Sequence, residues 1–324
     1  MGNEQVYLVT GAAGFIGSHL VEALLQRGSR VVGLDSFDAF YDPAVKRRNV
    51  ERALGHDSYT LVEGDIRDRA LVERLMSQER PDCVIHLAAR AGVRPSIEDP
   101  LLYQSVNVEG TNVILEAMRS TGIRRLLFAS SSSVYGNQKS VPFGEGDNVD
   151  HPISPYAATK KAGELLCYTY HHLYGIEAAC LRFFTVYGPR QRPEMAIHKF
   201  IRMIDAGERV PMFGDGETSR DYTYIGDIIQ GILAIDRSFT GYEVINLGES
   251  QPVGLRELVA IIGEQLGRTP EIDILPMQSG DVETTFADIT RARAHGYAPV
   301  TPIRDGIRSM VEWHRERQPQ MNLS

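Results

Sequence analysis

Three glycines spaced three residues apart follow the first apolar run of the chain. Residues 6–10 have the composition of a β-strand, Gly11, Gly14 and Gly17 come next, and an apolar helical pattern begins at once. Glycine can turn the chain where a Cβ would clash, and it lets a helix pack close to a strand. The free N–H groups of that helix then face the turn, where a pyrophosphate can bind. The order of strand, tight turn and helix therefore predicts a dinucleotide site.

An acidic residue ends the next strand-like run, residues 30–34. Asp35 stands at about the distance at which dinucleotide sites place the residue that binds the ribose. Its carboxylate can accept hydrogen bonds from the ribose hydroxyls of NAD and would repel the 2′-phosphate of NADP. No arginine follows Asp35 directly. We therefore expect NAD as the cofactor, although a glycine trio alone would also fit an ordinary turn.

Composition and charge place the chain among ordinary globular proteins. Its 324 residues suffice for one large α/β domain with an added lobe, or for two domains. A net charge of −8 gives no indication of nucleic-acid or anionic-membrane binding, and we see no membrane span or signal peptide. Cys83, Cys167 and Cys180 form no CxxC pair, so we expect buried free thiols and a cytoplasmic protein. No cluster of ligating side chains has metal spacing, and we expect no metal.

Strand-like and helix-like runs alternate through the first half of the chain. Further strands are expected at 59–63, 82–87, 124–129 and 177–182, and long helices at 101–120 and 155–174. This alternation indicates a parallel sheet covered on both faces, with ligands at the carboxyl ends of its strands. After Arg182 glycine, proline and arginine become frequent and the elements shorten. We therefore expect an α/β fold with a Rossmann-type doubly wound parallel sheet over residues 1–182, to which about 226–247 return, and a smaller α/β substrate-binding lobe over 183–324.

A tyrosine and a lysine four residues apart follow a helix-start signal, Ser154-Pro155. Tyr156 and Lys160 should therefore project from the same helix face. A phenol with a pKa of about 10 is a poor base at neutral pH. A fixed ammonium and the charge of an oxidised nicotinamide would both favour the phenolate, so we expect Tyr156 to act as a base with a lowered pKa. Taken alone, this spacing also occurs by chance on helix surfaces.

Together these motifs resemble the extended short-chain dehydrogenase/reductase family over nearly the whole chain, and within it the nucleotide-sugar epimerases. The resemblance implies that Ser131 hydrogen-bonds the sugar 4-hydroxyl, that Tyr156 takes its proton while C4 gives hydride to NAD, and that Lys160 holds the nicotinamide ribose. Asp65 and Ile66 would flank the adenine. The NAD-binding residues expected are Gly11, Gly14, Phe15, Ile16, Gly17, Asp35, Asp65, Ile66, Leu87, Ala88, Ala89, Asn107, Ser130, Tyr156, Lys160 and Phe183.

The two residues after Ser131 separate related activities. Relatives that dehydrate nucleotide sugars carry an Asp-Glu pair there, and relatives that decarboxylate UDP-glucuronate carry a glutamate at the second position. In this chain both are serine, Ser132 and Ser133. A hydroxyl cannot replace a carboxylate as a proton acceptor near neutral pH. The resemblance therefore favours an epimerase.

Residues 183–196 are similar to the corresponding segment of UDP-glucuronate 4-epimerases. Epimerases of UDP-glucose usually show an asparagine where Thr185 stands. A hexuronate carries a carboxylate at C6, which hydroxyl donors and a guanidinium suit. By this resemblance Thr185 and Arg192 are candidates for that carboxylate, although Arg192 could instead be a solvated loop residue or bind on the uridine side.

Other substrate contacts are expected by resemblance in the lobe and after the fourth strand. Arg220 would meet the diphosphate, unless it forms a structural ion pair with Asp221. Arg90 and Arg94 follow the strand-end alanines, and the sequence does not choose which of them meets the substrate. The substrate-binding residues expected are Arg90, Arg94, Ser131, Ser132, Ser133, Thr185, Arg192, Met195, Ala196, Phe213, Arg220 and Asp281.

The sequence thus predicts an NAD-dependent isomerase that converts UDP-glucuronate to UDP-galacturonate by transient oxidation at C4. Four alternatives stay open: a UDP-glucose or UDP-N-acetylhexosamine 4-epimerase, a UDP-glucuronate decarboxylase, an NAD-dependent reductase, and a non-catalytic NAD-binding protein. A homodimer is expected because the two long helices pair in relatives, although burial on the sheet would also explain their apolar stripes. Lone histidines such as His86 and His198 are expected to be structural.

Overall fold

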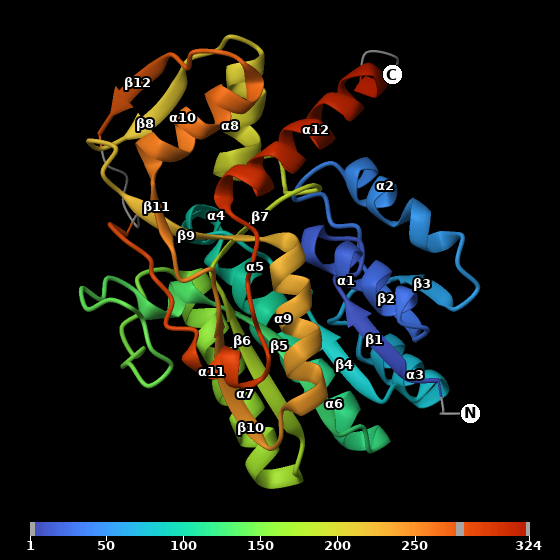
Figure 1. The fold of residues 1–324 in the computed structure, drawn as a ribbon. Helices are drawn as coiled ribbons and strands as arrows, with labels where there is room; N and C mark the ends of the chain where they lie inside the picture. The colour runs from blue at the N-terminus through green and yellow to red at the C-terminus, as the bar shows by residue number, and fades with distance from the viewer. Residues whose placement is uncertain (1–3, 277–281, 322–324) are drawn as a thin grey trace.

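The chain folds around a seven-stranded parallel sheet with helices on both faces (Figure 1). The computed structural model describes residues 4–276 and 282–321. The strand order is β10-β6-β5-β4-β1-β2-β3, and each neighbouring pair is parallel. The strands of this sheet are β1 (Val6–Thr10), β2 (Arg30–Asp35), β3 (Tyr59–Glu63), β4 (Cys83–His86), β5 (Arg125–Ser131), β6 (Glu177–Phe183) and β10 (Tyr242–Leu247). The expected doubly wound sheet is confirmed.

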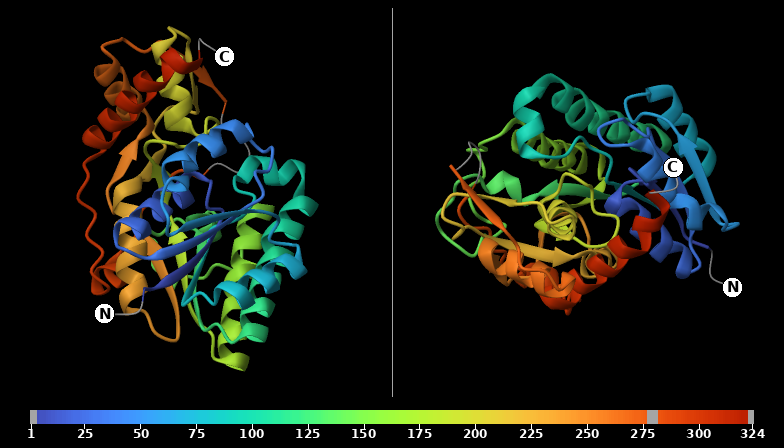
Figure 2. Two further views of the ribbon diagram at one scale, coloured as in Figure 1. Left: turned by 90° about the vertical axis from the view of Figure 1, so that its right-hand side faces the viewer. Right: turned by 90° about the horizontal axis from the view of Figure 1, so that it is seen from above.

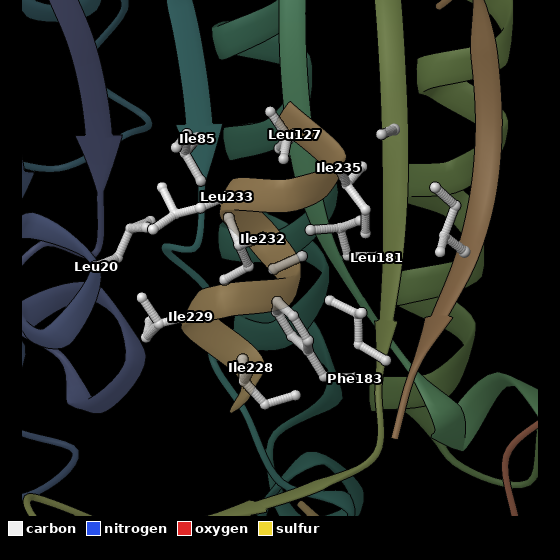
Figure 3. Close-up of a cluster of buried hydrophobic side chains, with 14 of the residues drawn as sticks. Leu20, Ile85, Leu127, Leu181, Phe183, Ile228, Ile229, Ile232, Leu233 and Ile235 are labelled. Atoms are coloured by element: carbon white, nitrogen blue, oxygen red, sulfur yellow. The ribbon is translucent and has the colours of Figure 1, made fainter. Parts of the chain in front are cut away.

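Two hydrophobic clusters, one on each face, hold the helices to the sheet. The first lies under α1 (Phe15–Gln26) and α9 (Ile225–Ser238), and Figure 3 shows the α9 residue Ile235 beside Leu181 of β6. The second cluster lies under three helices: α3 (Arg69–Glu79), α6 (Gly110–Thr121) and α7 (Pro155–Tyr174). Both faces are covered, so the strands are apolar throughout rather than alternating with polar residues.

A smaller lobe lies beyond one end of the sheet (Figure 2). It contains a three-stranded sheet, β11-β9-β7, a two-stranded sheet, β12-β8, and three helices around a separate apolar cluster. The elements of the lobe are β7 (Thr185–Tyr187), β8 (Val210–Phe213), β9 (Ser219–Tyr224), β11 (Pro252–Gly254), β12 (Ile272–Leu275), α8 (Ala196–Asp205), α10 (Leu255–Leu266) and α12 (Ile303–Met321). Between them, α9 and β10 return to the large sheet, where β10 pairs with β6.

The helix expected at 101–120 is interrupted. It consists of α5 (Pro100–Gln104), a π-helical turn η1 (Ser105–Glu109) and α6. A π turn widens a helix locally and often marks a functional position, and no sequence signal used above distinguishes it from α-helix. The remaining elements are α2 (Pro43–Leu54), α4 (Val93–Glu98), the 3₁₀ turn η2 (Ser132–Tyr135) and α11 (Thr290–Ala294).

The cysteines and histidines behave as expected. Cys83, Cys167 and Cys180 are buried free thiols. The ring of His86 lies between the hydroxyls of Thr10 and Thr111, 2.7 and 3.1 Å away, and burial lowers its pKa to about 3.

Across residues 4–276 and 282–321, no helix is long and apolar enough to cross a membrane, and no group of three or more ligating side chains could hold a metal ion.

Candidate active site

A cavity of about 400 Å³ opens where the carboxyl ends of the strands meet the small lobe. A cavity of this size is typical of ligand sites. It is lined by almost all the residues expected to bind NAD: Gly11, Gly14, Phe15, Ile16, Gly17, Asp35, Asp65, Ile66, Leu87, Ala88, Ala89, Ser130, Tyr156, Lys160 and Phe183. It is also lined by seven of the twelve residues expected to bind substrate: Arg90, Ser131, Ser132, Ser133, Thr185, Arg192 and Met195. Arg90 and the serines lie at or just after the carboxyl ends of β4 and β5, and the other three lie in the lobe.

The glycine turn lines this cavity. Gly11 has φ +71°, and a Cβ there would lie 2.8 Å from the backbone nitrogen of Ala88. A Cβ on Gly17 would lie 2.0 Å from the carbonyl oxygen of Gly11, which no packing allows. The N-cap of α1 is Gly14, which supplies no side chain to the first N–H groups of the helix. These amides and the helix dipole therefore fit the pyrophosphate of a dinucleotide.

Asp35 closes the other side of the turn. Its carboxylate is 8% exposed and accepts hydrogen bonds from the backbone nitrogens of Ala13, at 3.0 Å, and Phe37, at 2.8 Å. Burial raises the pKa of Asp35, while these two N–H groups and Lys46 oppose the rise. The carboxylate lines the cavity with acceptor positions that suit ribose hydroxyls.

Tyr156 and Lys160 project into the cavity from the first turns of α7. Ser154 caps this helix, since its Oγ accepts a hydrogen bond from Ala157 N at 3.1 Å. The Lys160 Nζ lies 6.0 Å from the centre of the Tyr156 ring and donates to the carbonyl oxygen of Ala129 at 2.7 Å. Burial lowers the pKa of Lys160 to about 8. Tyr156 and Lys160 therefore project from the same face of α7, as the sequence predicted.

The surroundings of Tyr156 act on the pKa of its phenol in opposite directions. Burial raises the pKa of Tyr156. A hydrogen bond with Ser131 and the charge of Arg192 lower the pKa, but they offset only part of the rise. The cost of taking a phenolate out of water thus outweighs the nearby positive charge, and these surroundings favour the protonated phenol. The sequence could not indicate this, since burial depends on elements far apart along the chain.

The serines at the end of β5 have two different environments. Ser131 Oγ lies 3.1 Å from Ser133 Oγ and accepts a hydrogen bond from Ser133 N at 3.2 Å. Ser130 instead donates its hydroxyl to Glu164 Oε1, at 2.6 Å inside the protein. Of these two serines, Ser131 is therefore the one whose hydroxyl lies beside Tyr156.

Asn107 lies behind the cavity wall rather than on it. Its Nδ2 donates to Arg90 O and to Thr159 Oγ1, both at 3.0 Å, and its Oδ1 accepts from Arg90 N at 2.8 Å. This amide is buried within the π turn η1. It ties the loop after β4 to α7, so in this structure it shapes the cavity without lining it.

Two of the arginines that line the cavity, Arg90 and Arg192, contact the ring of Phe40. The guanidinium carbons of Arg90 and Arg192 lie 4.7 and 5.5 Å from the ring centre. Arg90 also forms an ion pair with Asp38, and Arg192 Nε lies 3.2 Å from Glu194 Oε1. Arg90 and Arg192 thus line the same cavity as Thr185 and Ser131.

The other predicted substrate residues lie elsewhere. Arg94, Ala196, Phe213 and Arg220 do not line the cavity, and Asp281 lies outside the described residues. Arg94 stacks over the ring of Phe213 at 5.4 Å. Arg220 donates to the carbonyl oxygens of Ser219 and Glu283, at 2.8 and 3.2 Å.

Sequence reasoning missed the loop that follows β2 and the first turn of α2. Ser36, Asp38, Phe40, Tyr41 and Lys46 all line the cavity. Lys46 Nζ donates to Asp38 O at 2.8 Å and lies 4.7 Å from the Tyr41 ring centre. The aromatic residues that follow Asp35 closely in the sequence were the signal that could have identified this part of the cavity.

Comparisons with known proteins agree with this geometry. A family model described as the NAD dependent epimerase/dehydratase family matches residues 7–248. The chain is 41% identical over 312 residues to a protein of Thermodesulfobacterium geofontis named UDP-glucuronate 4-epimerase, covering 96% of each. The crystal structure of UDP-glucuronic acid 4-epimerase from Bacillus cereus, in complex with UDP-glucuronic acid and NAD, has a TM-score of 0.91 and 35% identity over 96% of this chain and 99% of that chain. UDP-glucose 4-epimerase from Thermotoga maritima, with UDP-glucose, has a TM-score of 0.90 and 32% identity at the same coverage.

Proposed function

The chain belongs to the NAD dependent epimerase/dehydratase family, and we propose that it is an NAD-dependent 4-epimerase that interconverts UDP-glucuronate and UDP-galacturonate. One observation carries the proposal. A single cavity contains the dinucleotide turn, the Tyr156–Lys160 pair with Ser131, and a threonine and an arginine from the lobe, Thr185 and Arg192. The similarity to named UDP-glucuronate 4-epimerases extends over nearly the whole chain.

The residues present fit NAD. The uncapped N-terminus of α1 suits the pyrophosphate and the carboxylate of Asp35 suits the ribose. Lys160 also lines the cavity, and its ammonium would bind the second ribose. When bound, the oxidised nicotinamide supplies an acceptor for the C4 hydride and a positive charge beside the phenol. All other steps belong to the side chains of this protein.

Tyr156 handles the proton. Its Oη takes the proton of the sugar 4-hydroxyl as the C4–H bond breaks, and Ser131 Oγ holds the same oxygen in place. The 4-ketose then turns over within the cavity, so that the opposite face of C4 receives hydrogen. Tyr156 returns the proton to the same oxygen. Burial raises the pKa of Tyr156, and a positive charge beside the phenol would lower it and so favour the phenolate that the reaction needs.

A hexuronate substrate places a further demand on the site. Its 4-ketose is a β-keto acid, which loses CO₂ when the C5–C6 bond breaks and its electron pair moves to C5. Thr185 and Arg192 would hold the carboxylate and so restrain this loss. Ser132 and Ser133 line the cavity where decarboxylating and dehydrating relatives carry carboxylates, which leaves no acid or base for those reactions at these positions.

Proton NMR of UDP-glucuronate, incubated with the enzyme and no added cofactor, tests the proposal. UDP-galacturonate should accumulate to an equilibrium mixture, because each turnover regenerates its own NAD⁺. A pentose product would identify a decarboxylase. Conversion of UDP-glucose or UDP-N-acetylglucosamine, with UDP-glucuronate unchanged, would assign the neutral sugars instead.

We further propose the domain division expected above, with residues 183–324 as the substrate lobe and about 226–247 belonging to the NAD-binding domain. The pairing of β10 with β6 and the packing of α9 on the large sheet support it. The buried free thiols are compatible with a reducing cytoplasm.

A homodimer is also proposed. Along α7, Leu165, Tyr168 and Leu173 are 55%, 52% and 59% exposed, and Leu101 of α5 is 77% exposed. Exposed apolar side chains on one long helix favour burial against a second copy. Light scattering of the double variant Leu165→Glu/Leu173→Glu should show a monomer, whereas an unchanged mass would exclude this face.

A further inference from the structure

The loop that carries Arg192 is tied to α1, the helix that begins at the glycine turn. His19 Nε2 lies 2.9 Å from the carbonyl oxygen of Pro189. Glu22, on the next turn of the same helix, forms an ion pair with Arg190, with Oε1 and Nη2 2.7 Å apart. His19 and Glu22 lie three residues apart and therefore share a helix face. Two consecutive loop residues are thus held by one face of α1.

The chemistry of these contacts is well defined. Burial and the charge of Arg190 lower the pKa of His19 to about 4, so its ring is neutral at pH 7. A carbonyl oxygen only accepts, so Nε2 carries the hydrogen and donates it to Pro189 O. The side chains of Arg190 and Glu22 are only 16% and 15% exposed, which protects their attraction from screening by solvent.

The backbone of the loop is strained at the same place. Arg190 has φ +68°, a left-handed conformation that is uncommon for a residue with a Cβ. Such a residue persists only where its surroundings hold it, and strained residues gather at functional sites. The ion pair with Glu22 is a contact that can hold it.

The far side of the loop is fixed to the lobe. Gln191 is 1% exposed, and its Nε2 donates to Val186 O at 2.9 Å. Nδ1 of His198 lies 2.6 Å from the carbonyl oxygen of Gln191. Arg192 follows directly, and its guanidinium lines the cavity. Arg192 therefore extends from a segment that is held on one side by α1 and on the other by the lobe.

We propose that His19, Glu22 and Arg190 form a latch that positions Arg192 for the C6 carboxylate of the sugar. They are positioning residues, since none of the three lines the cavity. The inference rests on the proposed function, because it assigns the specificity of the same site. It predicts that loosening the latch weakens recognition of the carboxylate while the UDP half of the substrate binds as before.

Calorimetry with the purified enzyme tests the latch without requiring turnover. The variants Glu22→Gln and Arg190→Gly each remove the ion pair, and glycine also relieves the left-handed strain. Each should raise the Kd for UDP-glucuronate about fivefold, equivalent to about 1 kcal/mol. The Kd for UDP, which has no sugar carboxylate, should be unchanged. Glu79→Gln, which removes the ion pair with Arg30 at the opposite end of the sheet, is the matched control and should change neither value.

Epistasis with Arg192 separates positioning from general stability. Arg192→Ala should itself weaken UDP-glucuronate binding, and adding Glu22→Gln to it should have no further effect, because residues acting through one group are not additive. Equal weakening of UDP and UDP-glucuronate by Glu22→Gln, or a full extra loss in the Arg192→Ala background, would overturn the latch. Failure of the proposed function is a separate result: the wild-type enzyme would leave UDP-glucuronate unconverted in the NMR assay, whatever the latch variants do to binding.

Discussion

Glu164 and Arg182 form a two-pronged ion pair inside the protein, one helical turn beyond Lys160. The two oxygen–nitrogen distances are 2.8 and 2.9 Å, and the side chains are 1% and 2% exposed. Ser130 donates to the same carboxylate, and the remaining Arg182 amine donates to the hydroxyl of Tyr135 at 3.0 Å. The pair therefore joins α7 to β5 and β6 beside the residues proposed to be catalytic.

Replacing one partner of this pair should destabilise the protein strongly. Glu164→Gln leaves the charge of Arg182 buried without a counterion, and we expect a loss of about 3–5 kcal/mol in the free energy of unfolding. Urea denaturation measures it. Glu164→Gln/Arg182→Met should be more stable than Glu164→Gln. Glu63→Gln, which removes an exposed pair with Arg47, should cost less than about 1 kcal/mol. Similar losses for Glu63→Gln and Glu164→Gln would contradict this account.

Tyr156→Phe should abolish epimerisation and leave the fold and NAD content intact. The phenol oxygen carries the proton in both directions, and general acid–base catalysis contributes about 10²–10⁴-fold. The rate is followed by NMR, and bound NAD by absorbance after purification. Tyr103→Phe is the matched control, because its ring contacts Tyr156 edge-on at 6.2 Å while its hydroxyl donates to Ala91 O. Near-normal turnover by Tyr156→Phe would refute the mechanism.

Gly17→Ala should empty the NAD site. The added Cβ would lie 2.0 Å from Gly11 O and force the turn apart. We expect NAD to bind at least about tenfold more weakly, a change of about 1.4 kcal/mol or more. Fluorescence titration with NAD⁺ and NADH measures it. Gly254→Ala, at the start of α10, meets no atom within 4 Å and should bind NAD normally.

Thr185→Val should impair the uronate reaction and increase loss of CO₂. The variant keeps the shape of the side chain but removes the hydroxyl donor, and a hydrogen bond to a charged group is worth about 1.5 kcal/mol or more. We therefore expect kcat/KM for UDP-glucuronate to fall about tenfold, with a rising fraction of UDP-pentose by chromatography. Thr185→Ser should retain wild-type behaviour. Unchanged rate and product in Thr185→Val would remove Thr185 from the carboxylate site.

Lys160 should give stability a measurable pH dependence in the ligand-free chain. Its folded pKa is about 8, below the ordinary lysine value of 10.5. Between these values the unfolded chain binds more protons, so the free energy of unfolding rises with pH. Relative to Lys160→Met, in which this titration is absent, the gain between about pH 7.5 and about pH 9.5 should be about 2 kcal/mol. Parallel pH profiles for the two proteins would show that Lys160 is not buried as described.

The strands and the glycine turn could be predicted because their signals are local. Apolar runs of four to seven residues bounded by turn residues mark the strands of a covered parallel sheet, and α7 begins at the expected Ser154-Pro155. The boundaries were less accurate: the strand expected at 124–129 extends to Ser131. The π turn around Asn107 was not predictable, since it depends on how the neighbouring helix and loop pack.

The sequence by itself determined the fold class, the dinucleotide turn and the shared face of Tyr156 and Lys160, because each depends on residues close together along the chain. Only the tertiary structure decided that Arg90 and Arg192 line the cavity while Arg94 and Arg220 do not. It also decided that Tyr156 is buried, which raises the pKa of its phenol. Exposure and the distance between charges arise from packing between distant segments, and no local pattern encodes them.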